Sequence, residues 1–63
     1  MTTVNGKTYT ATPGMTIADL VQELVGREAG VAVAVDGAVV PRSAWGTTEV
    51  SGDIDIVTAA QGG

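Results

Sequence analysis

Histidine and cysteine, which carry much of protein catalysis and metal binding, are both missing from this chain of 63 residues. Without histidine the commonest general base is lost, and without cysteine there is no thiolate nucleophile and no disulfide. The usual ligands of zinc are lost as well. Carboxylates and Lys7 remain as candidate catalysts, but so short a chain leaves little room for a pocket that would desolvate them. The composition therefore disfavours an enzyme.

Basic residues and long apolar runs are also scarce. Lysine and arginine number 3 against 7 acidic residues, which gives a formal net charge of −4. Nucleic acids and anionic membranes attract proteins through basic patches, so this balance disfavours both and favours partners with basic docking surfaces. No apolar run approaches the ~20 residues of a membrane-spanning helix, and the N-terminus lacks the pattern of a signal peptide. The expected location is the cytoplasm.

Apolar residues are present in sufficient number for one core. They make up 44% of the chain, and Tyr9 and Trp45 are the only aromatic residues among them. A chain of this length forms one domain of marginal stability. Residues 59–63 contain no large apolar side chain and no strand-forming residue. We therefore expect a single domain over residues 1–58 and a flexible C-terminal tail over residues 59–63.

Turn signals divide the chain into short strands. Asn5-Gly6 predicts a β-hairpin over residues 2–12, because both turn residues tolerate the positive φ of a type I′ turn. Asp36-Gly37 predicts a second hairpin, whose outgoing strand ends at Pro41. The strands outside the first hairpin are expected at residues 31–35, 38–40 and 54–58.

One helix is predicted after the first hairpin. Thr16 can cap its N-terminus, and Asp19 lies in its first turn, where a negative charge suits the helix dipole. Apolar residues then recur with helical spacing at Ile17, Leu20, Val21, Leu24 and Val25. We expect this stripe to face the core, and Gly26 to end the helix in a left-handed conformation.

The order of elements is therefore β-β-α-β-β-β. A helix with one apolar face packs on one face of a sheet. The last strand fits best in the middle, beside and parallel to the first, because crossover connections are right-handed. This arrangement is the β-grasp, or ubiquitin-like, fold: an α+β fold with a mixed sheet of four to five strands and one main helix. Its strand order rests on packing and fold analogy.

The chain ends in Gly62-Gly63. Alone, this pair does not distinguish a functional terminus from a frayed end. The functional interpretation rests on the α-carboxylate of Gly63, a group that ionises with a pKa of about 3.3–3.7 and is a poor electrophile until activated. Adenylation by ATP would give it a good leaving group. Glycines lack Cβ and permit close approach to a partner's active site, and Ala59 and Ala60 add reach.

Over nearly its whole length the sequence resembles the ThiS-type sulfur carriers of thiamin (thiazole) biosynthesis. The markers are weak singly, but their order and spacing are specific. They are Asn5-Gly6-Lys7, Thr16-Ile17-Ala18-Asp19-Leu20, Val31-Ala32-Val33-Ala34-Val35-Asp36-Gly37, Val39-Val40-Pro41-Arg42-Ser43-Ala44-Trp45, Gly52-Asp53 and Ile56-Val57-Thr58-Ala59-Ala60-Gln61-Gly62-Gly63. One departure is Asp36, where the family frequently has asparagine, and either residue fits a tight turn.

The resemblance implies a role and partners. A ThiF-like adenylyltransferase would use Mg-ATP to form an acyl-adenylate on Gly63. Sulfur from a cysteine desulfurase, as persulfide, would convert it to a thiocarboxylate for thiazole synthase, a ThiG-like enzyme. Gly62 would thread into partner sites, and Gln61 is either read by partners or a plain spacer. The chain itself would bind no cofactor and no metal, and would be a protein co-substrate.

Other residues have weaker functional interpretations. Trp45 could lie on a docking surface, but we favour a place in the core. Arg42 could pair with an acidic partner, but a solvated loop charge is favoured. Asp53 and Asp55 could suggest metal or acid-base chemistry, yet their spacing of two places them on the polar face of a strand, where solvation or cross-strand pairing is expected. Carriers of this fold usually dock through a mildly apolar sheet face.

Three other functions share some of these features. A MoaD-like carrier for molybdopterin, or another ubiquitin-related sulfur carrier, would use the same C-terminal chemistry, although Pro41-Arg42-Ser43-Ala44-Trp45 fits ThiS better. A ubiquitin-like modifier would also use Gly62-Gly63, and isopeptide conjugates in a lysate would reveal it. A plain β-grasp binding module would tolerate removal of Gly63.

Overall fold

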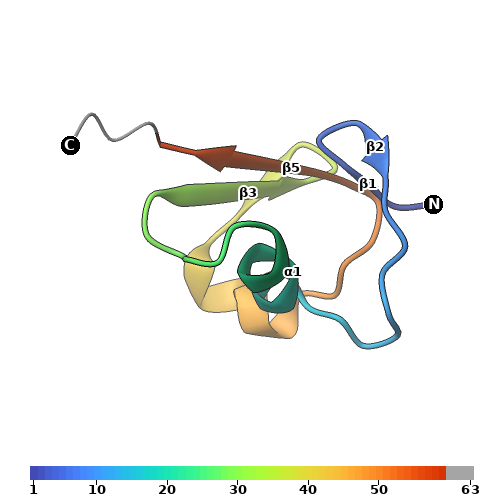
Figure 1. The fold of residues 1–63 in the computed structure, drawn as a ribbon, viewed down its shortest axis with the longest axis horizontal. Helices are drawn as coiled ribbons and strands as arrows, with labels where there is room; N and C mark the ends of the chain where they lie inside the picture. The colour runs from blue at the N-terminus through green and yellow to red at the C-terminus, as the bar shows by residue number, and fades with distance from the viewer. Residues whose placement is uncertain (60–63) are drawn as a thin grey trace.

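The computed structural model describes residues 1–59 of the chain. Its order of elements is the predicted one, with a 3-10 helix added before the last strand (Figure 1). The elements are β1 (Thr3–Val4), β2 (Lys7–Thr8), α1 (Ile17–Leu24), β3 (Val31–Val35), β4 (Ala38–Val40), η1 (Arg42–Thr47) and β5 (Asp53–Thr58). No helix of this described part is long and apolar enough to cross a membrane.

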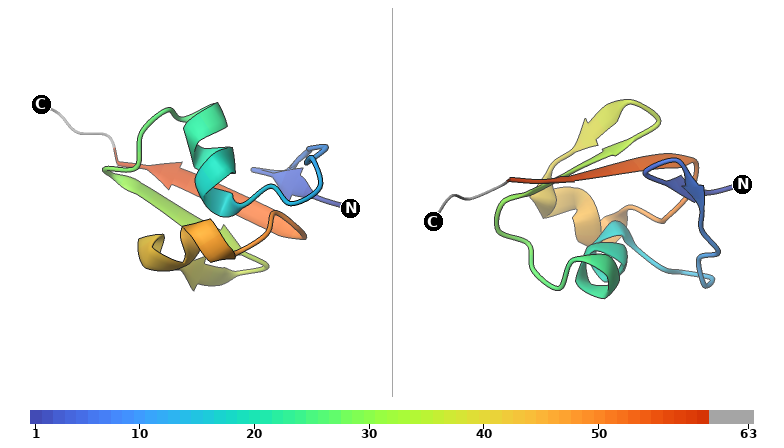
Figure 2. Two further views of the ribbon diagram at one scale, coloured as in Figure 1. Left: turned by 90° about the horizontal axis from the view of Figure 1, so that it is seen from below. Right: turned by 45° about the horizontal axis from the view of Figure 1, so that its top comes forward.

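The five strands form one mixed sheet in the order β2-β1-β5-β3-β4. β5 lies in the middle, parallel to β1 and antiparallel to β3. α1 and η1 both lie against one face of this sheet, and the other face is open (Figure 2). The predicted α+β architecture of the β-grasp type, with the last strand beside the first, is therefore confirmed.

Both predicted tight turns are present. Asn5 and Asp36 have φ angles of 51° and 50°, and each is followed by a glycine that also has positive φ. These angles are those of type I′ turns, which match the twist of the strands that they join. The first hairpin is much shorter than the predicted span of residues 2–12, because β1 and β2 have 2 residues each.

α1 begins where the sequence indicates. The amide of Asp19 donates to Oγ1 of Thr16 at 3.3 Å, and the amide of Thr16 donates to Oδ2 of Asp19 at 3.1 Å. This reciprocal capping box satisfies two amides that the first helical turn leaves without partners. Val25 is the C-cap, and Gly26 follows with a φ of 83°, as predicted.

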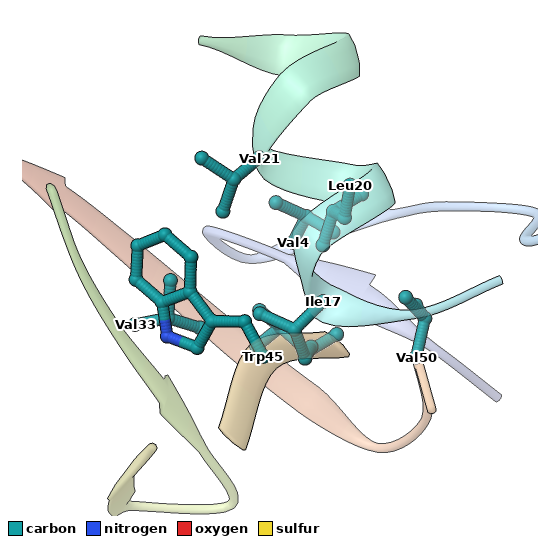
Figure 3. Close-up of a cluster of buried hydrophobic side chains, with 8 residues drawn as sticks. Val4, Ile17, Leu20, Val21, Val33, Trp45 and Val50 are labelled. Carbon is teal, nitrogen blue, oxygen red and sulfur yellow. The ribbon is translucent and has the colours of Figure 1, made fainter. Parts of the chain in front are cut away.

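The core lies between the helices and the sheet (Figure 3). Its members come from β1, α1, β3, η1, β5 and the loop before β5: Val4, Ile17, Leu20, Val21, Val33, Trp45, Val50 and Ile54. The prediction that the whole helical stripe is core is wrong at Leu24, which is 48% exposed. The buried residues of α1 lie in its first part, and Leu24 is its last helical residue, where the chain leaves the sheet for the loop to β3.

Candidate functional site

The residues predicted to carry the chemistry, Gln61, Gly62 and Gly63, lie outside the described residues. The structure describes the end of the strand that precedes them in the sequence. β5 ends at Thr58, which pairs with Val31 at the start of β3. The amide of Ala59 then donates to the carbonyl oxygen of Gly30 at 2.7 Å. The ladder with β3 therefore continues to the last described residue.

Two turn residues clasp β5 from opposite sides, one at its start and one at its middle. Oδ1 of Asp36, in the β3–β4 turn, accepts a hydrogen bond from the amide of Asp53 at 2.9 Å. Oδ1 of Asn5, in the β1–β2 turn, accepts one from the amide of Ile56 at 2.7 Å. These side-chain bonds hold the central strand to both neighbouring hairpins, so they fix where β5 lies and which way it points.

The face of the sheet opposite α1 carries an exposed apolar strip. Val57 on β5 is 63% exposed, and Val39 on β4 is 76% exposed. Between them lie the small residues Ala32 and Ala34 of β3, since Ala32 pairs with Val57 and Ala34 pairs with Val39. Asp55, which pairs with Ala34, lies on the same face. The sequence alone did not predict this strip, although the alternation of side chains along a strand places Val57 on the same face as Asp53 and Asp55.

Trp45 and Arg42 differ in exposure. Trp45 is 2% exposed, and its Nε1 donates to the carbonyl oxygen of Val40 at 2.9 Å. Its indole ring lies between α1 and β3, which confirms the core interpretation and excludes it as an accessible docking residue (Figure 3). Arg42 is exposed as the first residue of η1, on the surface where a solvated charge was predicted.

The carboxylates of β5 do not form a reactive pair. Asp53 and Asp55 are both exposed, and Oδ1 of Asp53 accepts a hydrogen bond from Oγ1 of Thr3 at 2.8 Å. This contact is the cross-strand pairing that the alternation predicted. Within residues 1–59 there is no pocket and no cluster of three potential metal ligands. What the described part offers is therefore a surface and an anchored strand end.

Comparisons with protein families and with solved structures both find ThiS proteins. The model of the ThiS family matches residues 2–63 of the chain. Among solved structures, the chain is similar to the thiamine biosynthesis protein ThiS from Geobacter metallireducens, with a TM-score of 0.76 and 28% sequence identity. The match covers 98% of this chain and 97% of that one. No curated protein matches the chain significantly in sequence.

Proposed function

Since the chain belongs to the ThiS family, whose members are sulfur carriers of thiamine biosynthesis and not enzymes, we propose that it carries sulfur as a thiocarboxylate on Gly63. The observation that carries the proposal is the family match over residues 2–63, which includes Gly62 and Gly63. The anchored end of β5 supports it, because Ala59, the last described residue, is exposed and still hydrogen-bonded to Gly30, so the described strand ends at the surface.

The proposed chemistry takes place in three steps on partner enzymes. The Gly63 carboxylate attacks the α-phosphate of Mg-ATP on a ThiF-like adenylyltransferase, which releases pyrophosphate and forms an acyl-adenylate. A persulfide supplied by a cysteine desulfurase then displaces AMP and leaves an acyl disulfide. A thiol reduces this disulfide, and the product is the thiocarboxylate. Thiazole synthase, a ThiG-like enzyme, then takes the sulfur from the thiocarboxylate. We place all of these steps in the cytoplasm.

The carrier itself provides the surface and the tail that its partner enzymes would recognise. The open face offers Val39 and Val57 beside Asp55, so a partner with an apolar centre and a basic rim would complement it. Glycine at positions 62 and 63 allows the chain to pass through a channel too narrow for side chains. Gln61 is the one polar side chain that a partner could read in this segment.

The test is intact-mass spectrometry after incubation with ATP, the adenylating enzyme, the desulfurase and cysteine. The expected product has one oxygen replaced by one sulfur, and fragmentation places the change on Gly63. A matched control carries one extra residue after Gly63, which should fold normally and remain unmodified. Failure to form either adenylate or thiocarboxylate with a partner that activates another ThiS protein would refute the proposal.

A further inference from the structure

The backbone groups of β5 alternate between its two neighbours. The carbonyl of Asp53 accepts a hydrogen bond from the amide of Asp36 at 2.7 Å, and the amide of Ala59 donates to Gly30. The odd-numbered residues of this strand therefore face the β3 side. The even-numbered residues face the β1 side, where the carbonyl of Ile54 accepts from the amide of Asn5 at 2.8 Å.

On the β1 side the pairing stops early. The register of β1 with β5 consists of Thr3 with Asp53 and Val4 with Ile54. The side chain of Asn5 then takes the amide of Ile56, and the chain turns away at Gly6. The ribbon views show the β1–β2 hairpin beside only the first part of β5 (Figures 1 and 2).

Three backbone groups are left on this edge. The carbonyl of Ile56 and both the amide and the carbonyl of Thr58 face the β1 side, and within residues 1–59 none of them has a hydrogen-bond partner there. A carbonyl and an amide two residues apart on one edge are the acceptor and donor that an added strand requires. Thr58 is exposed and Ile56 is half-buried, so the groups of Thr58 are the more accessible to a second chain.

This edge also lacks the usual protection. Natural proteins commonly block an exposed strand edge with proline, lysine or a bulge. β5 reads Asp-Ile-Asp-Ile-Val-Thr, with neither proline nor lysine, and its register with β3 is unbroken from Val35–Ile54 to Val31–Thr58. The free edge thus comes just before the residues predicted to enter a partner's active site.

We propose that the adenylating partner adds an extended segment to β5 at Ile56–Thr58 and so aligns the tail with its active site. This proposal rests on the proposed function. It follows from continuity, because the edge leads directly into residues 59–63, four of which are alanine or glycine, so that the backbone is the main feature to recognise there. Strand addition gives such recognition through main-chain hydrogen bonds.

The first test is Thr58→Pro with Thr58→Ala as its matched control. Proline removes the amide that faces the open edge but leaves the ladder with β3 complete, a position where strands accept proline. Thr58→Pro should raise the KM of the adenylating enzyme for the carrier about tenfold, the effect of one lost hydrogen bond. Thr58→Ala keeps the amide and should stay within about twofold of the wild type.

The second test is amide hydrogen exchange on the unmodified sequence, which holds even if the proline variant does not fold. In the free chain the Thr58 amide should exchange fast and that of Ala59 slowly. Binding to the adenylating enzyme should slow Thr58 at least about tenfold.

The outcomes separate the two proposals. If the wild type is adenylated while Thr58 stays fast in the complex, or folded Thr58→Pro keeps its KM, the edge proposal alone is wrong. If the wild type is never adenylated, both proposals fall. Protection of Thr58 that rises with the concentration of the free chain would assign the edge to a second copy and overturn the proposal.

Discussion

The two halves of β5 have the same backbone conformation but different surroundings. The first half lies between β1 and β3, is bound at Asp53 by the side chain of Asp36, and contains Ile54, which is 0% exposed. The second half has β3 as its strand partner and, on the other side, the bond from the amide of Ile56 to Asn5, and its core-facing residue Ile56 is only half-buried. The first half holds the fold together, whereas the second is paired mainly on one side and is free to meet a partner.

This difference shows how a chain of 63 residues can serve both stability and recognition. A small domain has few residues to spare for a separate binding lobe. Here one strand does both: Ile54 near its start is buried in the core, and its last two residues, Val57 and Thr58, are exposed. Substitutions in the first half should therefore alter stability, and substitutions in the second half should alter partner binding.

The largest expected effect is that of Ile54→Ala. The side chain of Ile54 is fully buried, so its truncation should lower the free energy of unfolding by about 2–5 kcal/mol. Val57→Ala, on the open face of the second half, should change it by less than about 0.5 kcal/mol. Chemical denaturation of both variants measures the contrast. Equal losses in the two variants would show that Val57 is packed as firmly as Ile54 and is not free for a partner.

Gly52→Ala should cause the second-largest loss of unfolding free energy. Gly52 has a φ of 73°, and a Cβ there would lie 2.6 Å from Oδ1 of Asp36, the atom that holds the amide of Asp53. Strain and the displaced clasp should together cost about 1–3 kcal/mol of unfolding free energy. Gly26→Ala is the control, since its φ is 83° but no atom lies within 4 Å of the added Cβ. A loss no larger than that of the control would exclude a role for the clasp.

Asn5→Gly should have a smaller effect and a more specific one. Glycine keeps the positive φ of the turn but removes the acceptor for the amide of Ile56, which should cost about 0.5–1.5 kcal/mol. The open edge would then include the amide of Ile56 as well, so this amide should exchange faster while that of Ala59 does not. Exchange rates followed by NMR give the answer, and unchanged protection of Ile56 would contradict the assigned bond.

Leu24→Gln should have the smallest effect. Leu24 is 48% exposed, so a polar replacement should alter the free energy of unfolding by about 0.5 kcal/mol or less. Leu20→Ala, on the buried part of the same helix, should cost about 2–5 kcal/mol. Thermal unfolding of the two variants compares them. A large loss at Leu24 would restore the prediction that the whole stripe is core.

Local features of the fold could be predicted from the sequence because they depend on neighbouring residues. Asn5-Gly6 and Asp36-Gly37 specify their turns through φ alone, and Thr16 with Asp19 specifies the start of α1. The end of the buried stripe could not be predicted, because the exposure of Leu24 depends on where the helix leaves the sheet.

Long-range features needed the structure. The bond from the amide of Asp53 to Asp36 and the one from the amide of Ile56 to Asn5 join residues 17 and 51 positions apart. The open edge of β5 follows from the register and length of β1, which no local pattern encodes. For the candidate site, the sequence predicted the terminal Gly62-Gly63 and a sheet face for docking, but Val39 and Val57 emerged only from strand pairing.

The burial of Trp45 has a practical consequence for all of these measurements. It is the only tryptophan in the chain, and its indole is 2% exposed with its Nε1–H bonded to Val40. Its fluorescence should therefore shift to longer wavelength on unfolding, since the ring passes from an apolar core into water. The ring belongs to η1 and packs in the core, so chemical change at Gly63 should leave its emission unaltered. The carrier thus contains its own optical probe of folding, which needs no label.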